Sequence, residues 1–405
     1  MLGVLIIGYV WPEPGSSAAG ARMMQLIEFF REQGYKITFA TSAKRSDYMA
    51  GLEEIGIATR EIQPNNDEFD TFIQDLDPQI VLFDRFMMEE QFGWRVDKFC
   101  PDALKILDTE DLHSLRKVRE QILKTGQVFN SAYLNANITK REAAAIFRCD
   151  ISLIISEFEM NLLIDKLKIP EHILFYLPFM MKPASSEVKK FEDRKDFVSI
   201  GNFLHEPNWR AVLHLKNNIW PVLRKLVPEA HLHIYGAYPS QKVWNLHNES
   251  EKFLVHGRAE NALEVMSAAR VCLAPIPFGA GLKGKLAEAM LCGTPSVTTN
   301  TGSEGMAGQL DWNGFIEHDD DLFIEAARNL YSNEQLWNEM SANGYKIIEK
   351  RFDMNYHQDR LKSYLSRTSR ELQKHRELNF TGSMMKHHLQ RSTYFMSRYI
   401  QLKNS

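Results

Sequence analysis

Cysteine is scarce in this chain and follows no recognisable spacing. The sequence has 405 residues and only four cysteines, none in a CxxC pair or at a metal-ligand spacing from histidine. The cysteines therefore offer no zinc-type ligand set, and we expect reduced, mostly buried thiols.

An excess of basic charge and a long apolar run are also missing. The formal net charge is −4, so any contact with a polyanion or a membrane must come from a local site. No run of about 18 apolar residues occurs, and we expect no helix that crosses a bilayer. The apolar run at 2–10 lacks the basic flank and the small-residue cleavage site of a signal peptide. We expect it to be a buried first strand of a cytoplasmic protein.

The composition that is present indicates a globular protein with more than one core. Hydrophobic residues make up 44% of the chain and charged residues 25%. A single core rarely grows beyond about 250–300 residues. We therefore expect two domains with a cleft between them, and an additional element.

Short apolar runs alternate with helical stretches, a pattern typical of a parallel sheet covered by helices on both faces. One series starts at residue 2 and a second at residue 197, on either side of a polar stretch at 182–195. We predict an α/β protein with two doubly wound, Rossmann-like domains facing a cleft. The expected bounds are 1–182, 183–352, and 353–405 for C-terminal helices and a basic tail that return to the first domain.

The most informative segment is a glycine-rich loop between a predicted strand and a predicted helix. It contains Gly279, Gly281 and Gly284, and Lys283 and Lys285 flank the last of these. Glycines let the backbone approach a ligand closely, and the amide groups of a helix start favour an anion. Lysines there stabilise the charge that grows on a departing nucleoside diphosphate, and no metal is then required.

Glu288 lies about one turn into the same predicted helix, where its carboxylate can accept hydrogen bonds from two ribose hydroxyls. The structural alternative is a tight strand–helix connection with solvated lysines. Cations at a helix start oppose the macrodipole unless an anion is bound, which favours the phosphate interpretation.

Phe278–Pro295, followed by 298–306, resembles the donor-binding segment of family-four retaining glycosyltransferases (glycosyl transferases group 1). It also resembles a subgroup with the pattern Gly-Ala-Gly-x-Lys-Gly-Lys. Shorter similar pieces occur in the family's order at 199–208, 233–236 and 255–258. The resemblance implies the GT-B fold.

The resemblance also implies which residues bind the donor. The Gly201 loop would face the diphosphate, 255–257 would lie against the base, and Glu288 would hold the ribose. The loop at 12–22 resembles the family's first loop, although a plain strand–helix connection is the alternative, and its glycine spacing does not fit a dinucleotide fingerprint. The donor-binding set is Gly15, Gly201, Asn202, His256, Gly257, Arg258, Gly279, Ala280, Gly281, Leu282, Lys283, Gly284, Lys285 and Glu288.

Position 280 departs from the family. Its members commonly have two glutamates eight positions apart, and the first contacts the donor sugar. Here the second is Glu288 and the first is replaced by Ala280. The donor sugar is therefore not identified, although the subgroup is expected to carry this substitution without losing activity.

Candidate catalytic groups follow a predicted strand of the first domain. Asp108, Asp111 and His113 lie at its carboxyl end, where a base for an acceptor hydroxyl is expected, and Lys285 is the fourth catalytic candidate. The structural alternative is an acidic helix start with an ion pair to Arg116.

The run His318–Asp321 superficially resembles a metal-binding aspartate motif. It precedes a predicted helix, so we interpret these acids as cap and dipole partners and predict no metal site.

The tail beyond residue 365 carries eight lysines or arginines and two glutamates, with aromatic residues interleaved. Such a segment can lie on an anionic membrane, which would place the protein at the inner face of that membrane. A helix packed on the first domain and a partly disordered end are the alternatives.

The resemblance implies an enzyme, a hexosyltransferase-type glycosyltransferase of polysaccharide biosynthesis. It would move a sugar from a nucleoside diphosphate sugar to a hydroxyl of a glycan, polysaccharide or lipid-linked precursor, with retention and without metal or cofactor. The second domain would hold the donor and the first would admit the acceptor; nucleic acid is not an expected partner. The alternatives are a non-catalytic sugar-nucleotide-binding or assembly protein and a sugar-nucleotide isomerase or NAD-dependent oxidoreductase, although the nicotinamide fingerprint is missing.

Overall fold

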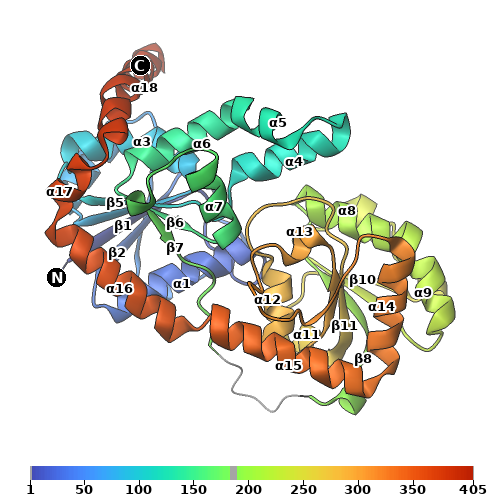
Figure 1. Ribbon diagram of the computed structural model, residues 1–405. Helices are drawn as coiled ribbons and strands as arrows, with labels where there is room; N and C mark the ends of the chain where they lie inside the picture. Colours follow the sequence, from blue (N-terminus) through green and yellow to red (C-terminus); the bar gives the residue numbers. More distant parts are fainter. Residues whose placement is uncertain (1, 183–188, 405) are drawn as a thin grey trace. The chain divides into compact units, whose positions relative to one another are not determined.

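The computed structural model describes residues 2–182 and 189–404 (Figure 1). Contacts divide them into two compact units. Unit 1 comprises Met1–Glu13, Arg22–Leu177 and Tyr356–Ser405, and unit 2 comprises Pro14–Ala21 and Pro178–Asn355. The expected boundary between residues 182 and 183 adjoins 183–188, which lie outside the described residues.

Unit 1 is built on a seven-stranded parallel sheet with the order β3-β2-β1-β4-β5-β6-β7. The central strands are almost entirely buried because helices cover both faces; Figure 1 shows α1 below the strands and α3 and α6 above them. The strands are β1 Gly3–Gly8, β2 Lys36–Thr41, β3 Ala58–Glu61, β4 Ile80–Asp84, β5 Leu104–Asp108, β6 Ile151–Ile154 and β7 Leu174–Tyr176.

The helices of unit 1 follow the strands and include three from the end of the chain. Some begin at a side-chain cap; for example, Ser156 accepts the amide N–H of Glu159 at the start of α7. The helices are α1 Ala18–Glu32, α2 Glu68–Leu76, α3 Phe86–Phe99, α4 His113–Thr125, α5 Phe129–Asn135, α6 Asn137–Arg148, α7 Glu157–Asp165, α16 Met354–Arg370, α17 Leu372–Glu377 and α18 Phe380–Asn404.

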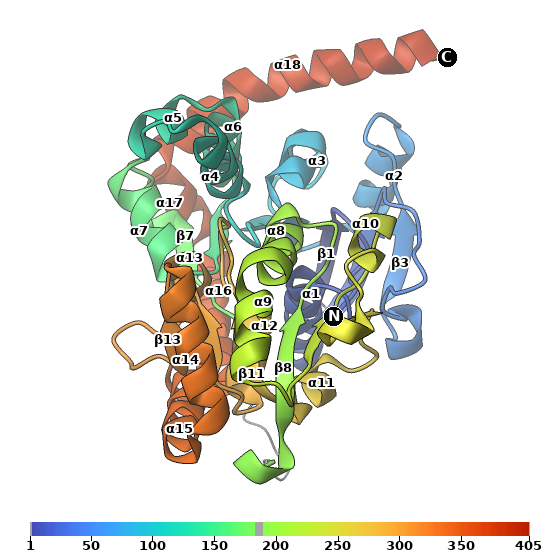
Figure 2. The same ribbon diagram turned by 90° about the vertical axis from the view of Figure 1, so that its right-hand side faces the viewer.

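The C-terminal helices pack on unit 1 and are helical almost to the end of the chain. Arg376 of α17 binds both carboxylate oxygens of Asp150, at 2.8 and 2.9 Å, and two main-chain carbonyls. Figure 2 shows α18 running past α6 and α3, and both helices contact it. No helix of the described residues is long and apolar enough to cross a membrane.

Unit 2 is built on a six-stranded parallel sheet with the order β10-β9-β8-β11-β12-β13. From β8 the chain adds β9 and β10 on one side and then β11, β12 and β13 on the other. The strand order therefore reverses between β8 and β11. The strands are β8 Lys195–Ile200, β9 Leu232–Tyr235, β10 Phe253–Gly257, β11 Ala269–Ala274, β12 Ser296–Thr298 and β13 Gly314–Ile316.

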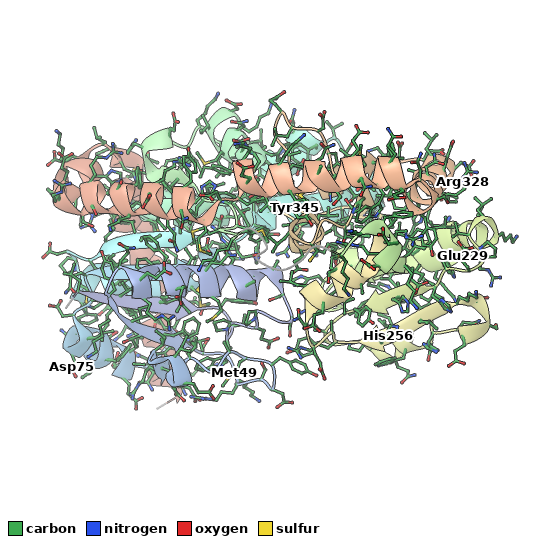
Figure 3. All side chains as sticks on the ribbon, turned by 90° about the horizontal axis from the view of Figure 1, so that it is seen from below. Met49, Asp75, Glu229, His256, Arg328 and Tyr345 are labelled. Carbon is green, nitrogen blue, oxygen red and sulfur yellow. The ribbon has the colours of Figure 1, made fainter. Side chains whose placement is uncertain are left out.

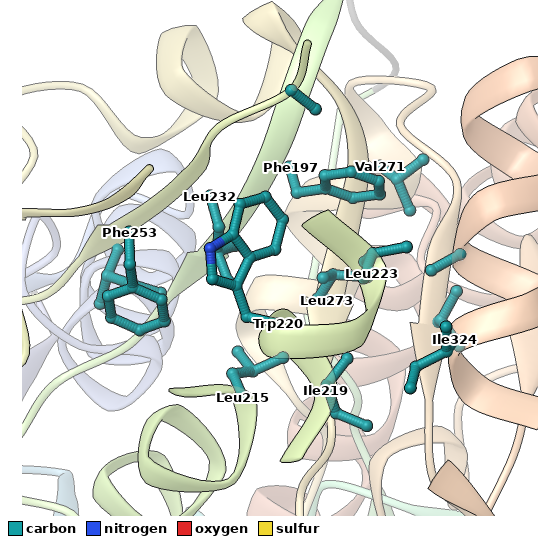
Figure 4. Packing of buried hydrophobic residues seen from close by; sticks show 14 of the residues in the cluster. Phe197, Leu215, Ile219, Trp220, Leu223, Leu232, Phe253, Val271, Leu273 and Ile324 are labelled. Atoms are coloured by element: carbon teal, nitrogen blue, oxygen red, sulfur yellow. The ribbon is translucent and has the colours of Figure 1, made fainter. Parts of the chain in front are cut away.

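A large apolar cluster covers one face of this sheet (Figure 4). Trp220 is its largest member, and its ring meets that of Phe197 edge-on with centroids 6.0 Å apart. A π-helical segment at Leu215–Ile219 joins α8 to α9 and contributes two further members of the cluster. The helices of unit 2 are α8 Glu206–His214, α9 Trp220–Leu226, α10 Gln241–Trp244, α11 Ala262–Ala268, α12 Gly284–Leu291, α13 Asn300–Ser303, α14 Asp320–Ser332 and α15 Glu334–Arg351.

The acidic run before α14 acts as a helix cap. A carboxylate oxygen of Asp319 accepts the amide N–H groups of Asp321 and Leu322, at 2.9 and 3.1 Å. This contact supports the interpretation of 318–321 as cap and dipole partners.

Candidate functional site

The glycine-rich loop lies at the point where the strand order of unit 2 reverses. β11 ends at Ala274 and α12 starts at Gly284, while the neighbouring strand β8 ends at Ile200 and leads into Gly201. In open parallel sheets, ligands bind outside the carboxyl ends of the strands at such a reversal. The two glycine-containing loops therefore occupy the place where this fold binds ligands.

Lys285 joins the two loops. Its ammonium donates a hydrogen bond to Asn208 Oδ1 at 2.8 Å, and Asn208 in turn donates to the carbonyl of Asn202 at 2.8 Å. A Cβ atom at Gly201 would lie 2.7 Å from the Lys285 Nζ. A larger residue at 201 would therefore displace the end of the lysine side chain from its place across the ends of β8 and β11.

Burial moves the pKa values of two groups on α12 toward neutrality. It lowers the pKa of Lys285 from 10.5 to about 8, although Cys272 and Glu288 act in the opposite direction. Burial likewise raises the pKa of Glu288, which Lys285 opposes. Both charges have lost solvation, so an anion bound beside Lys285 would favour its ammonium form.

Lys283 has a different position from Lys285. Its ammonium donates to the carbonyls of Ala280 and Gly281, at 3.0 and 2.6 Å, and so binds its own loop. Gly281 has a φ of +62°, a conformation that glycine adopts without strain. These contacts shape the loop, and binding of Lys283 to a phosphate oxygen stays a prediction.

Two threonines at the end of β12 form hydrogen bonds to the beginning of the glycine-rich loop. The hydroxyl of Thr298 donates to the carbonyl of Ala274 and that of Thr299 to the carbonyl of Ile276, both at 2.7 Å. Thr299 also accepts the amide N–H of Gly302 at the start of α13. The end of β12 therefore fixes the last residue of β11 and the start of the glycine-rich loop.

The loop 14–21 contacts the same part of unit 2. The hydroxyl of Ser16 accepts from Arg258 Nε at 3.3 Å, and its carbonyl accepts from the Asn202 amide at 3.2 Å. A Cβ atom at Gly15 would lie 2.6 Å from Arg258, and one at Gly284 would lie 2.6 Å from Ala18. Four predicted residues from distant parts of the sequence thus come together here: Gly15, Asn202, Arg258 and Gly284.

His256 belongs to a different cluster, on the side of the sheet formed by β9 and β10. It is exposed (Figure 3), stacks on Tyr235 with centroids 4.6 Å apart, and lies 2.9 Å from the ring nitrogen of His233. Partial loss of solvent around its ring, followed by the neighbouring His233, lowers its pKa. The next residue, Gly257, has a φ of +77° and lies against Trp244.

Sequence reasoning missed two members of the unit 2 site. Asn208 was quoted only as part of a motif, and its contact with Lys285 joins residues 77 positions apart. Gly236 follows β9 and donates its N–H to the Gly257 carbonyl at 2.7 Å, and a Cβ atom on it would meet the Gly201 carbonyl at 2.0 Å. The available signal was a glycine at the end of β10 and directly after each of the neighbouring strands β8 and β9.

In unit 1, Asp108 is held in a buried ion pair. Arg22 donates to both of its carboxylate oxygens at 2.8 to 3.2 Å and also to the carbonyl of Leu177. Both carboxylate oxygens of Asp108 are thus engaged by the guanidinium of Arg22. The structure therefore favours a structural role for Asp108, in place of the catalytic role that the sequence suggested.

Asp111 and His113 lie together at the start of α4. One oxygen of Asp111 is 3.5 Å from His113 Nε2 and 3.4 Å from Arg116. The main-chain N–H of His113 donates to Glu142, whose pKa burial raises to about 7. Asp111 and His113, both catalytic candidates, are therefore neighbours, and Arg116 makes the ion pair of the structural alternative.

Glu110, between these candidates, was not singled out from the sequence. Its φ is +63°, and Arg85, after the adjacent strand β4, has a φ of +69°. Burial raises the pKa of Glu110 to about 7, Asp111 adds to the rise, and Arg85 opposes it. Residues with strained backbone conformations are enriched at functional sites, but no sequence pattern predicted the conformations of Glu110 and Arg85.

Two Rossmann-like units on parallel sheets, followed by C-terminal helices, make this a protein of the GT-B fold. Residues 194–333 match the family model described as glycosyl transferases group 1. No curated protein sequence matches the chain.

Solved structures support the assignment of the fold over most of the chain. A sucrose-phosphate synthase from Thermosynechococcus elongatus is 14% identical with a TM-score of 0.67, covering 91% of this chain and 99% of that one. Anabaena Alr3699/HepE, solved with UDP-glucose, is 12% identical with a TM-score of 0.65, covering 90% and 100%. TarM is 10% identical with a TM-score of 0.69, covering 90% and 98%.

Proposed function

We propose that this protein is a glycosyltransferase that moves a hexose from a nucleoside diphosphate sugar to a hydroxyl group of a glycan, polysaccharide or lipid-linked acceptor. The transfer retains the anomeric configuration and uses neither a metal nor another cofactor. One observation carries the proposal: Lys285, the start of α12 and the Gly201 loop converge at the strand-order reversal of unit 2.

The chemistry of this place suits a diphosphate. The start of α12 has no acidic residue in its first turn and no side-chain cap, so its amide groups and dipole favour an anion. The leaving nucleoside diphosphate gains negative charge as the sugar departs, and the Lys285 ammonium stabilises that charge. A cation fixed in this way performs the task that a metal ion performs in other transferases.

The neighbouring residues suit the rest of a donor. Glu288 is one turn further along α12, and its carboxylate is the proposed partner of the ribose hydroxyls. Gly15, Gly201 and Gly284 are placed where an added Cβ would meet a neighbouring side chain, so the backbone there is closely packed. HepE was solved with UDP-glucose and TarM with UDP, which makes uridine diphosphate sugars the first donors to test.

Donor binding is tested by thermal unfolding with a panel of nucleoside diphosphate sugars. A ligand at one hundred times its dissociation constant stabilises the folded state by about 2.7 kcal/mol, so the correct donor is recognised by an increase in the unfolding temperature. We expect Lys285→Ala to abolish the stabilisation and donor hydrolysis. Lys346→Ala is the matched control, because Lys346 is an exposed lysine of the same unit.

Two further measurements test the rest of the proposal. Activity should survive EDTA, and NMR of the product should show the anomeric configuration of the donor. Stabilisation by no nucleoside diphosphate sugar, or equal loss in Lys285→Ala and Lys346→Ala, would refute the assignment of the site.

A non-catalytic sugar-nucleotide-binding protein is the second candidate, and Ala280 favours it. This buried alanine stands where the resembling family commonly has a glutamate that contacts the sugar. Such a protein would show the thermal stabilisation and its loss in Lys285→Ala, without hydrolysis or transfer for any donor that binds.

A further inference from the structure

The last helix of the chain carries positive charge and no negative charge. α18 contains four lysines or arginines among its 25 residues, and neither aspartate nor glutamate. The whole chain has a net charge of −4, so this helix is a local exception. An exposed helix of this composition is attracted to an anionic surface.

One face of α18 is held against unit 1. The ring of Tyr394 meets that of Trp94 edge-on, with centroids 5.3 Å apart, and Ser397 is buried and accepts from Arg95 at 3.3 Å. Nearer its start, a Cβ atom on Gly382 would lie 2.1 Å from a carbonyl of α6. The helix is therefore fixed by defined contacts along much of its length.

The opposite face of α18 exposes large apolar side chains. Phe395, Tyr399 and Leu402 are 66, 63 and 75% exposed and follow each other at helical spacing. With Met384, they fall within an arc of about 60° at about 100° per residue, and Ser397 lies on the other side. Phe380 and Met396, 77 and 60% exposed, flank this arc. These six residues form the α18 stripe.

We propose that the α18 stripe lies on an anionic membrane surface, with the helix axis in the membrane plane. Apolar and aromatic side chains on one side of a cationic helix are the features of an interfacial helix. A second copy of the chain is a poorer occupant, because two α18 helices would bring like charges together.

The contacts between α18 and unit 1 hold the helix folded, with the α18 stripe facing away from unit 1. Arg398, beside the stripe, forms an ion pair with Asp67 at 3.0 Å, and Lys386 lies 3.8 Å from Asp97. The exposed Lys403 near the helix end is therefore the cation that we expect the anionic surface to meet. Because the helix is already folded on unit 1, binding does not incur the ordering cost of a disordered tail. The inference does not depend on sugar transfer, although a lipid-linked acceptor would be reached from such a surface.

Binding of the full chain to vesicles tests the proposal. We expect sedimentation with vesicles of phosphatidylglycerol and phosphatidylcholine, much weaker binding to phosphatidylcholine alone, and weakening with added salt. The triple variant Phe395→Ser, Tyr399→Ser, Leu402→Ser should bind anionic vesicles at least about tenfold more weakly. The matched control is Val222→Ser with Leu226→Ser, two exposed apolar residues on α9.

A charge variant keeps the test decisive if the triple variant does not fold. Lys403→Glu leaves the stripe intact and should reduce binding to anionic vesicles several-fold. Absence of vesicle binding by the wild type, or equal binding by the wild type and both variants, overturns the proposal. A dimer by light scattering that the triple variant abolishes, without vesicle binding, also overturns it and assigns the stripe to a second copy.

Discussion

Lys285 illustrates how a single residue combines local sequence with distant contacts. Its place beside Gly284 follows from the motif, but its pKa follows from burial, and its direction follows from the hydrogen bond to Asn208. The lowered pKa means that burial makes the ammonium form of Lys285 less favourable, and a bound anion would offset this effect. A site prepared for an anion should therefore respond to pH in a defined way.

We predict that kcat/KM for the donor falls as pH rises through about 8. This parameter reports the free enzyme, in which the pKa of Lys285 is about 8, and the ammonium form is the one that binds phosphate. The limb for kcat should lie at higher pH, because the bound diphosphate favours the ammonium. In Lys285→Arg the basic limb should disappear, since arginine stays charged. An unchanged basic limb in that variant would contradict the assignment.

Asp108 leads to a prediction about stability. Its carboxylate and Arg22 are both almost fully buried, so Asp108→Asn leaves the arginine charge without its partner. We expect a loss of about 3–5 kcal/mol in the free energy of unfolding, measured in urea. Residual activity should follow the folded fraction. A stable variant with greatly reduced kcat would instead restore Asp108 as a catalytic candidate.

At the level of elements, central strands are predictable from sequence, whereas most edge strands are not. Central strands such as β1 and β4 contain a run of consecutive apolar residues, because helices cover both of their faces. The strands β3, β7 and β13 escaped prediction, and each lies at the edge of its sheet. They have three or four residues, which is too short for a recognisable strand pattern, and β3 is also largely exposed.

The same distinction applies to the site. The loop before α12 could be recognised because its glycines, lysines and Glu288 are neighbours in the sequence. The partners of those residues could not be recognised, because Asn208 and Ser16 reach the site only through the folding of distant segments. The backbone conformation of Glu110 is likewise a product of its surroundings.

The loop after β8 provides a prediction at this scale. A Cβ atom at Gly201 would lie 2.7 Å from both Lys285 and Asn208, so Gly201→Ala must displace them. We expect donor affinity to fall by about tenfold or more, with a small change in stability, measured by calorimetric titration and thermal unfolding. Gly3→Ala is the control, because a Cβ there meets only ordinary contacts. Unchanged donor affinity in Gly201→Ala would show that the Lys285 position is not needed for binding.

For the molecule as a whole, the two units have separate sources of stability. Unit 2 contains every proposed donor contact, whereas the end of the chain belongs to unit 1 through α16, α17 and α18. The clearest of these attachments is the pair between Arg376 and Asp150. Burial alone would raise the pKa of Asp150, but Arg376 and nearby lysines lower it below its ordinary value.

Arg376→Ala tests this separation. It removes the charge partner of a buried carboxylate and two hydrogen bonds to carbonyls of the loop before β5, so unit 1 should lose stability. We expect faster hydrogen exchange in α17 and around β5 and β6, with unchanged affinity for the nucleoside diphosphate. The lowered pKa of Asp150 means that its ionised carboxylate stabilises the folded wild type. This stabilisation should disappear as acid protonates Asp150, so the free energy of unfolding should fall with decreasing pH, and it should fall less in Arg376→Ala. Reduced nucleotide affinity in this variant would mean that donor binding depends on unit 1 as well.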